Sequence, residues 1–142
     1  MLYGTLLHPE ILSVLASAGH GSRVLIADGN YPFVTGSLPK VKIVYLNLAP
    51  GILTATDVLK VLIAAVPIET AHIMEPQSPP APPIAREFRE LLPESIPIRS
   101  LDRFAFYETV RSPDTALVIA TGEQRVYANI LLTIGVVPPP RA

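Results

Sequence analysis

The chain has 142 residues, of which 49% are hydrophobic and 16% charged, and its formal net charge is −1. Charged residues make up about a quarter of an average domain, so this chain has little polar surface to cover it, which favours a homo-oligomer. Its eleven Lys and Arg residues are scattered. Without a basic patch, neither nucleic acid nor an anionic membrane surface is an expected partner.

The sequence contains no cysteine and therefore no disulfide framework. Pro9 and Glu10 interrupt the segment where a signal peptide would need a continuous apolar run. The longest apolar stretch, 58–68, contains Lys60 and is shorter than the roughly 20 residues of a membrane span. These features predict a cytoplasmic protein without membrane segments.

Helical and strand patterns alternate from the start of the chain. Apolar residues recur at helical spacing over 9–18, with Gly19 as the expected stop. The run 23–28 predicts a buried strand followed by a turn, and 41–48 predicts a second strand.

A helix over 56–65 is predicted from the capping residues Thr54, Thr56 and Asp57, and a strand over 68–74 follows it. The segment 75–83 holds five prolines in nine residues. Proline disfavours both helix and ladder hydrogen bonds, so we expect a surface linker inside one domain; a docking ligand for aromatic grooves is the alternative.

The remaining expected elements are a helix over 84–92, a strand over 96–99, a helix over 101–110 with Ser100 as its N-cap, and strands over 115–121 and 129–136. Helices that alternate with strands predict an α/β class. We therefore expect a single domain over 1–142, with a three-layer α/β/α fold around a mostly parallel or mixed sheet.

Several kinds of site are disfavoured. The three histidines lack a partner at helical spacing and there is no cysteine, so no metal site is expected. Neither GxGxxG nor GxxxxGK[ST] occurs, which leaves a nucleotide cofactor without a phosphate loop. No GxSxG nucleophile elbow is present.

His20 stands between two glycines, after the first helix and before the first strand. Flanking glycines allow a sharp turn that presents the imidazole to a cavity, which is typical of a catalytic position. Spacing alone favours the alternative, a polar residue in a helix-terminating turn that the negative end of the helix dipole stabilises.

Asp28 follows a buried strand, at the end where open α/β sheets bind ligands, although an Asp-Gly turn explains it equally well. Arg103, Tyr107, Tyr127 and Asn129 carry guanidinium, hydroxyl and amide groups that suit a polyhydroxylated ligand. The alternative for these residues is ordinary packing and helix capping.

Four segments in register over nearly the whole chain carry a specific resemblance: 12–21, 24–32, 103–108 and 121–132. They include Gly-His-Gly, Asp28, Arg-Phe-Ala-Phe-Tyr-Glu, and Thr-Gly-Glu followed by Tyr-Ala-Asn-Ile-Leu-Leu. Together they resemble the ribose pyranase and fucose mutarotase (RbsD/FucU) family.

The resemblance implies a cofactor-independent isomerase in which His20 matches the proton donor. The positions that match sugar-binding residues are Asp28, Arg103, Tyr127 and Asn129, with Ala128 between the last two. Tyr107 is our own addition from the same segment as Arg103. The family also forms ring-shaped homo-oligomers with pockets near subunit contacts, which implies a decamer of stacked pentamers.

Within the family, 103–108 resembles the fucose branch, so the expected activity is interconversion of the anomers of L-fucose. Segments 32–50 and 75–83 depart from better-known members, which leaves the substrate open. The alternatives are a pyranase that converts ribopyranose to ribofuranose, a non-catalytic sugar-binding oligomer, and a purely structural assembly protein.

Overall fold

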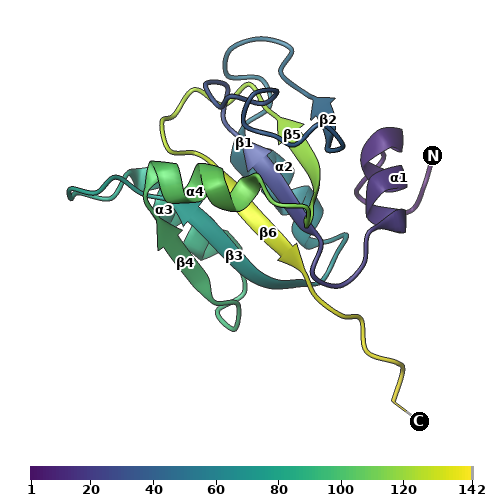
Figure 1. The fold of residues 1–142 in the computed structure, drawn as a ribbon. Coiled ribbons are helices and arrows are strands. Elements are labelled where there is room, and N and C mark those ends of the chain that lie inside the picture. The colour runs from purple at the N-terminus through teal and green to yellow at the C-terminus, as the bar shows by residue number, and fades with distance from the viewer. Residues whose placement is uncertain (142) are drawn as a thin grey trace.

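The computed structural model describes residues 1–141; Ala142, the last residue of the expected domain, lies outside the described part. The elements in chain order are α1 (Pro9–Ser17), β1 (Arg23–Ala27), β2 (Lys42–Tyr45), α2 (Ala55–Ile63), β3 (Ile68–Met74), α3 (Pro83–Leu91), β4 (Ile98–Leu101), α4 (Arg103–Val110), β5 (Thr115–Ala120) and β6 (Ile130–Ile134). The six strands form one sheet in the order β2-β5-β1-β6-β3-β4 (Figure 1).

The sheet is mixed because β6 runs against its neighbours. β1 pairs in parallel with β5, β5 with β2, and β3 with β4, whereas β6 is antiparallel to both β1 and β3. All strands except β6 therefore point the same way. Their carboxyl ends meet at one edge of the sheet, together with the residues that precede β6, and the turns before β1 and β3 lie at the opposite edge.

Helices cover both faces of the sheet, as the three-layer α/β/α prediction requires. α1, α2 and α3 pack on one face and α4 on the other (Figure 1). Each face of the sheet has its own hydrophobic core, and alternate residues of β1 belong to each. Ile26 lies in the core with Leu59 of α2 and Phe88 of α3, and Leu25 lies in the core with Phe106 of α4. Burial of β1 on both faces explains why its sequence is continuously apolar.

Helix α4 begins later than the sequence predicted. Leu101 still pairs with Met74 in the β3–β4 ladder, so the strand extends to residue 101 and Ser100 is not the helix cap. Asp102 is the N-cap instead, because its Oδ1 accepts hydrogen bonds from the backbone N–H groups of Phe104 and Ala105 at 3.0 and 3.1 Å. The helix over 101–110 was therefore predicted two residues too long.

Other boundaries differ by small amounts. β2 is shorter than the predicted 41–48, because only four of its residues pair with β5. Thr54 and Asp57, two of the three predicted capping residues, form a capping box for helix α2, which starts at Ala55. α1 ends at Ser17 and is capped by Ala18 in an extended conformation; the positive φ, +85°, falls at Gly21 rather than Gly19.

Most of the proline-rich segment is exposed and has no helix or strand; Pro82 is extended, and Pro83 already forms the first residue of α3. Among residues 1–141, no helix combines the length and apolarity needed to cross a bilayer.

Candidate active site

A cavity of about 290 Å³ lies at the edge where the parallel strands end, and we call it the Asp28 cavity. Its lining residues are Asp28, Asn30, Tyr31, Met74, Arg103, Tyr107, Val126, Tyr127 and Asn129. Five of the predicted ligand-binding residues thus come together: Asp28 follows β1, Arg103 and Tyr107 lie on α4, and Tyr127 and Asn129 precede β6. Ala128 is fully buried and does not line the cavity. The volume approaches that of small-molecule sites, which begin at about 300 Å³.

Asp28 and Asn129 are held together in this cavity. Asn129 Oδ1 accepts a hydrogen bond from the Asp28 backbone N–H at 2.8 Å, and Asn129 Nδ2 donates one to Asp28 Oδ2 at 3.0 Å. The backbone N–H of Asn30 donates to Asp28 Oδ1 at 2.9 Å. Burial raises the pKa of Asp28 above its ordinary value, although these hydrogen bonds act in the opposite direction.

Tyr127 has a left-handed backbone, with φ of +61°. A tyrosine in this region is strained, and such strain gathers at functional sites where the surroundings over-determine the conformation. Arg103 is the first residue of α4, and its guanidinium lies 4.7 Å from the centre of the Phe104 ring. Both residues also line a second hollow of about 350 Å³ beside residues 75–78, so the Asp28 cavity adjoins the proline-rich segment.

The sequence analysis did not select Tyr31, which is almost wholly buried. Its hydroxyl has no hydrogen-bond partner among residues 1–141. Burial, with Tyr107 and Asp28 nearby, raises its pKa, and the two tyrosine rings meet edge-on at 5.4 Å. The position of Tyr31, three residues after Asp28, could have suggested a place in the site. Only the folded turn over residues 28–31 shows that Tyr31 lines the cavity.

His20 lies at the opposite edge of the sheet. Its Nε2 is 2.7 Å from Glu69 Oε2, and the two side chains are 58% and 46% exposed. The five residues of β1, at about 3.3 Å each, place roughly 16 Å between this turn and Asp28. One chain therefore does not bring His20 to the Asp28 cavity. The sequence analysis missed Glu69, because its contact depends on β3 lying next to β6.

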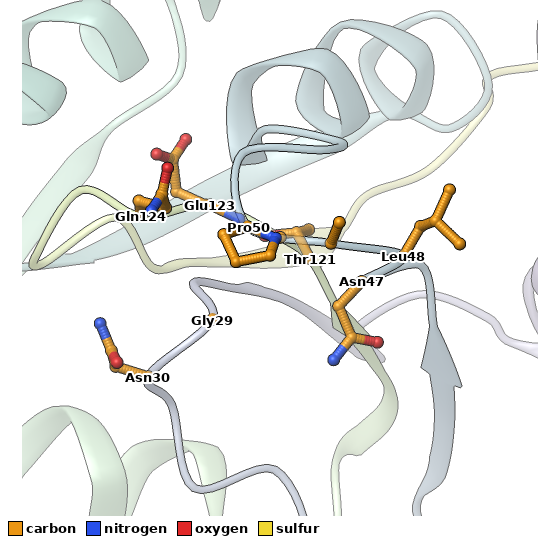
Figure 2. A pocket seen from close by; sticks show the side chains of 10 residues that line it. Gly29, Asn30, Asn47, Leu48, Pro50, Thr121, Glu123 and Gln124 are labelled. Atoms are coloured by element: carbon orange, nitrogen blue, oxygen red, sulfur yellow. The ribbon is translucent and has the colours of Figure 1, made fainter.

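A larger hollow, of about 440 Å³, shares Asn30 with the Asp28 cavity (Figure 2). Asn47, Leu48, Gln124 and the backbone around Gly122 line it, with none of the predicted site residues. Its buried carboxylate, Glu123, is already bonded to Arg125 at 2.8 Å and to the Ala55 amide at 3.2 Å. The Asp28 cavity, by contrast, is lined by five of the predicted ligand-binding residues.

The sequence model of the RbsD / FucU transport protein family matches residues 1–137. The chain belongs to this family. A curated relative, the fucose mutarotase of Danio rerio, is 33% identical over 95% of this chain and 92% of its own length.

Two solved structures extend the match to the fold. Bacillus subtilis RbsD, complexed with D-ribose, has a TM-score of 0.81 and 26% identity, over 96% of this chain and 99% of that one. The fucose mutarotase from Streptococcus pneumoniae, in complex with L-fucose, has a TM-score of 0.77 and 25% identity, over 92% and 94% of the two chains. The family resemblance seen in the sequence is thus confirmed.

Proposed function

We propose that this chain is a mutarotase that interconverts the α and β anomers of a free monosaccharide, with L-fucose as its substrate. The observation that carries the proposal is the buried Asp28–Asn129 pair, which faces a cavity lined also by Arg103 and three tyrosines. Carboxylate, amide and hydroxyl groups fixed in this way match the alternating donors and acceptors of a sugar. The 33% identity to a fucose mutarotase supports the same substrate.

The reaction moves only protons and needs no redox partner. Ring opening removes a proton from the anomeric hydroxyl and adds one to the ring oxygen; the aldehyde then rotates and closes on its other face. An imidazole, with an ordinary pKa of about 6.5, can accept and return such protons near neutral pH, typically for a gain of about 10²- to 10⁴-fold. We assign this role to His20.

In this proposal the Asp28 cavity binds the sugar. Asp28 and Asn129 hold its hydroxyl groups, while Arg103 and Tyr107 close the sides. Tyr127 also lines the cavity, and either its hydroxyl or a bound water makes the second proton transfer.

His20 must then come from a neighbouring copy, because roughly 16 Å of β1 separates it from the cavity of its own chain. Exposed apolar side chains occur at both edges: Phe104 and Val126 beside the cavity, and Val136 and Val137 after β6. A contact that joins two different surfaces repeats head to tail and closes into a ring where the rotation between neighbours allows it. Such a contact supports a homo-oligomer, for which we propose a decamer of stacked pentamers.

A second candidate is ribose pyranase activity, which needs the same ring opening and differs in the hydroxyl that closes the ring. The likeness to the RbsD structure with bound D-ribose favours it. For either activity we propose the cytoplasm as the site of action, which agrees with the absence of cysteine from the sequence.

Magnetisation-transfer proton NMR tests the proposal. On equilibrated L-fucose, with D-ribose in parallel, the wild-type protein should accelerate exchange between the anomeric signals, and His20→Ala should abolish the acceleration while sugar binding persists. Faster exchange for ribose alone would select the pyranase. Binding without acceleration would replace the enzyme with a sugar-binding oligomer, and an intact oligomer that binds no sugar would indicate a structural protein.

A further inference from the structure

The larger hollow of Figure 2, which we call the Asn47 hollow, adjoins the Asp28 cavity and takes no part in the reaction described above. Asn30 lines both spaces, so the two are neighbours along one edge of the sheet. The hollow measures about 440 Å³ and the cavity about 290 Å³. Together they lie inside the range of small-molecule sites, about 300–1,000 Å³. A single sugar unit in the Asp28 cavity therefore leaves the adjoining hollow open.

The floor of the Asn47 hollow is formed by backbone that is already fixed in place. The Gly51 N–H donates to the Gly122 carbonyl at 2.6 Å, and the Gly29 N–H donates to the Glu123 carbonyl at 2.8 Å. A Cβ at residue 122 would overlap the carbonyl oxygen of Ile52, so the two loops approach this closely only because residue 122 is a glycine. Three separate segments of the chain are thus locked together under the hollow.

The walls combine neutral amide groups with a small apolar surface. Asn30, Asn47 and Gln124 are all exposed and come from the three segments that meet at the floor (Figure 2). Each amide offers two N–H donors and an accepting oxygen. Leu48, which is 83% exposed, and Pro50 complete the lining. Hydroxyl groups of a sugar can bond to such amides while its C–H groups pack on the apolar side chains.

The hollow offers no free charge to a ligand. Among residues 1–141, Glu123 is the one ionisable residue that lines it, and its carboxylate is 2.8 Å from the Arg125 guanidinium and 3.2 Å from the Ala55 amide. A phosphate or carboxylate ligand would find no cation among the lining residues. The lining therefore favours a neutral, polyhydroxylated ligand over an anionic one.

We propose that the Asn47 hollow binds a second sugar unit, joined by a glycosidic bond to the reducing sugar in the Asp28 cavity. This inference rests on the proposed mutarotase function and extends its substrates to the reducing ends of short oligosaccharides. Ring opening uses only the anomeric hydroxyl and the ring oxygen, so a hydroxyl at C2, C3 or C4 can carry the second unit. The glycosidic bond is neither formed nor broken. Asn30, at the boundary, contacts both units.

The test compares L-fucose with three disaccharides, β-D-galactosyl-L-fucose linked (1→2), (1→3) and (1→4). Magnetisation-transfer NMR over a range of sugar concentrations gives kcat and KM for exchange of the fucose anomers. One linkage should give a KM about tenfold below that of L-fucose, as expected from the added hydrogen bonds. The linkage that does so identifies the hydroxyl that points from the Asp28 cavity into the Asn47 hollow.

Single variants locate the second unit. Asn47→Ala and Gln124→Ala should each raise the KM of the preferred disaccharide by about five- to tenfold, while the KM of L-fucose stays within about twofold of the wild type. Gln77→Ala is the matched control, because it removes an exposed amide from the other hollow beside the Asp28 cavity. It should change neither KM.

Four results would overturn the assignment. Acceleration of L-fucose but of no disaccharide would show that the second unit does not fit, with the mutarotase function intact. Equal effects of Asn47→Ala on both kinds of sugar would place Asn47 in the monosaccharide site. A loss of disaccharide affinity in Gln77→Ala alone would move the second unit to the other hollow. A smaller oligomer of Asn47→Ala in sedimentation velocity would make the hollow a contact between copies.

Binding separates this inference from the function on which it rests. If the wild type accelerates no sugar, the mutarotase proposal fails, and calorimetry then decides the second site by itself. Tighter binding of a disaccharide than of L-fucose, lost in Asn47→Ala and kept in Gln77→Ala, would still support the assignment. Equal affinity of the wild type for L-fucose and every disaccharide would overturn it.

Discussion

Asn129 bonds to both the backbone and the side chain of Asp28, at 2.8 and 3.0 Å, although the two residues are 101 positions apart in the sequence. Only 4% of Asp28 and 3% of Asn129 are exposed. The pair joins the end of β1 to the start of β6, so the same two hydrogen bonds hold the sheet edge closed and orient the carboxylate toward the cavity.

Replacing Asn129 with alanine should weaken both functions of the pair. The Asp28 N–H loses its acceptor and the carboxylate loses a donor, which should lower the free energy of unfolding by about 1–3 kcal/mol. Binding of L-fucose, measured by calorimetry, should weaken at least tenfold, because a difference of about 1.4 kcal/mol corresponds to that factor. Asn47→Ala, in the neighbouring hollow of Figure 2, is the control and should bind as the wild type does.

Because the pKa of Asp28 is raised, the difference in stability between the wild type and Asp28→Asn should depend on pH. Between the ordinary pKa of about 3.9 in the unfolded chain and the higher value in the folded protein, the folded state binds more protons. The contribution of Asp28 to stability therefore falls as pH rises through this window. The Tm advantage of the wild type over Asp28→Asn should be larger at pH 4 than at pH 7 in thermal unfolding. A gap that widens toward pH 7 would mean that the hydrogen bonds to the carboxylate outweigh its burial.

The proposed sharing of the site between subunits predicts complementation. At a fucose concentration well below the KM of Asn129→Ala, both His20→Ala and Asn129→Ala should show little activity alone. Oligomers formed by co-refolding equal amounts should recover roughly a quarter of the wild-type rate, because a random neighbour pair combines an intact cavity with an intact His20 in that fraction of cases. Mixing the two variants without subunit exchange is the control, and no recovery after exchange would mean that each chain completes its own site.

Arg125 should be more important for stability than its exposed neighbours. It donates to the nearly buried Glu123 at 3.0 and 2.8 Å, and to Glu87 of α3 at 2.7 Å. Burial alone would raise the pKa of Glu123, but the Arg125 hydrogen bonds bring it below the ordinary value. Arg125→Met leaves this carboxylate without its cation and should cost about 2 kcal/mol in urea unfolding.

Glu87→Gln is the matched control for Arg125, because it removes only the exposed half of the network. It should cost less than about 1 kcal/mol. Equal losses of unfolding free energy in the two variants would show that the buried Glu123–Arg125 pair stabilises the protein no more than the exposed Glu87–Arg125 pair. Since a depressed carboxyl pKa stabilises the folded state above the unfolded pKa, the loss in Arg125→Met should also shrink as the pH falls below about 4.

The two possible caps of α4 can be compared directly. Asp102→Ala removes the acceptor of two amides and should lower stability by about 1 kcal/mol. It should also weaken sugar binding, because Arg103 is the next residue and lines the cavity. Ser100→Ala, at the cap that the sequence suggested, should change the unfolding midpoint little; a larger effect at Ser100 than at Asp102 would argue against the observed start of the helix.

Local sequence patterns were sufficient to predict most helices and strands. They failed where the end of an element is set by pairing with another strand. The capping box of Thr54 and Asp57 and the apolar run of β1 depend on neighbours in sequence, and both were recognised. Ser100 was chosen as a cap because nothing in residues 96–101 reveals that Leu101 pairs with Met74. A strand's end is set by its partner, which the local sequence does not contain.

The sequence by itself determined the α/β class, the family and the residue types of the cavity, since these follow from hydrophobic period, motif order and side-chain chemistry. Only the tertiary structure decided which of those residues meet. The antiparallel insertion of β6 between β1 and β3 places Asn129 beside Asp28 at one edge and Glu69 beside His20 at the other. Strand order depends on long-range pairing, fixed by how apolar faces are buried together, and so no local pattern could show that His20 and the Asp28 cavity lie at opposite edges.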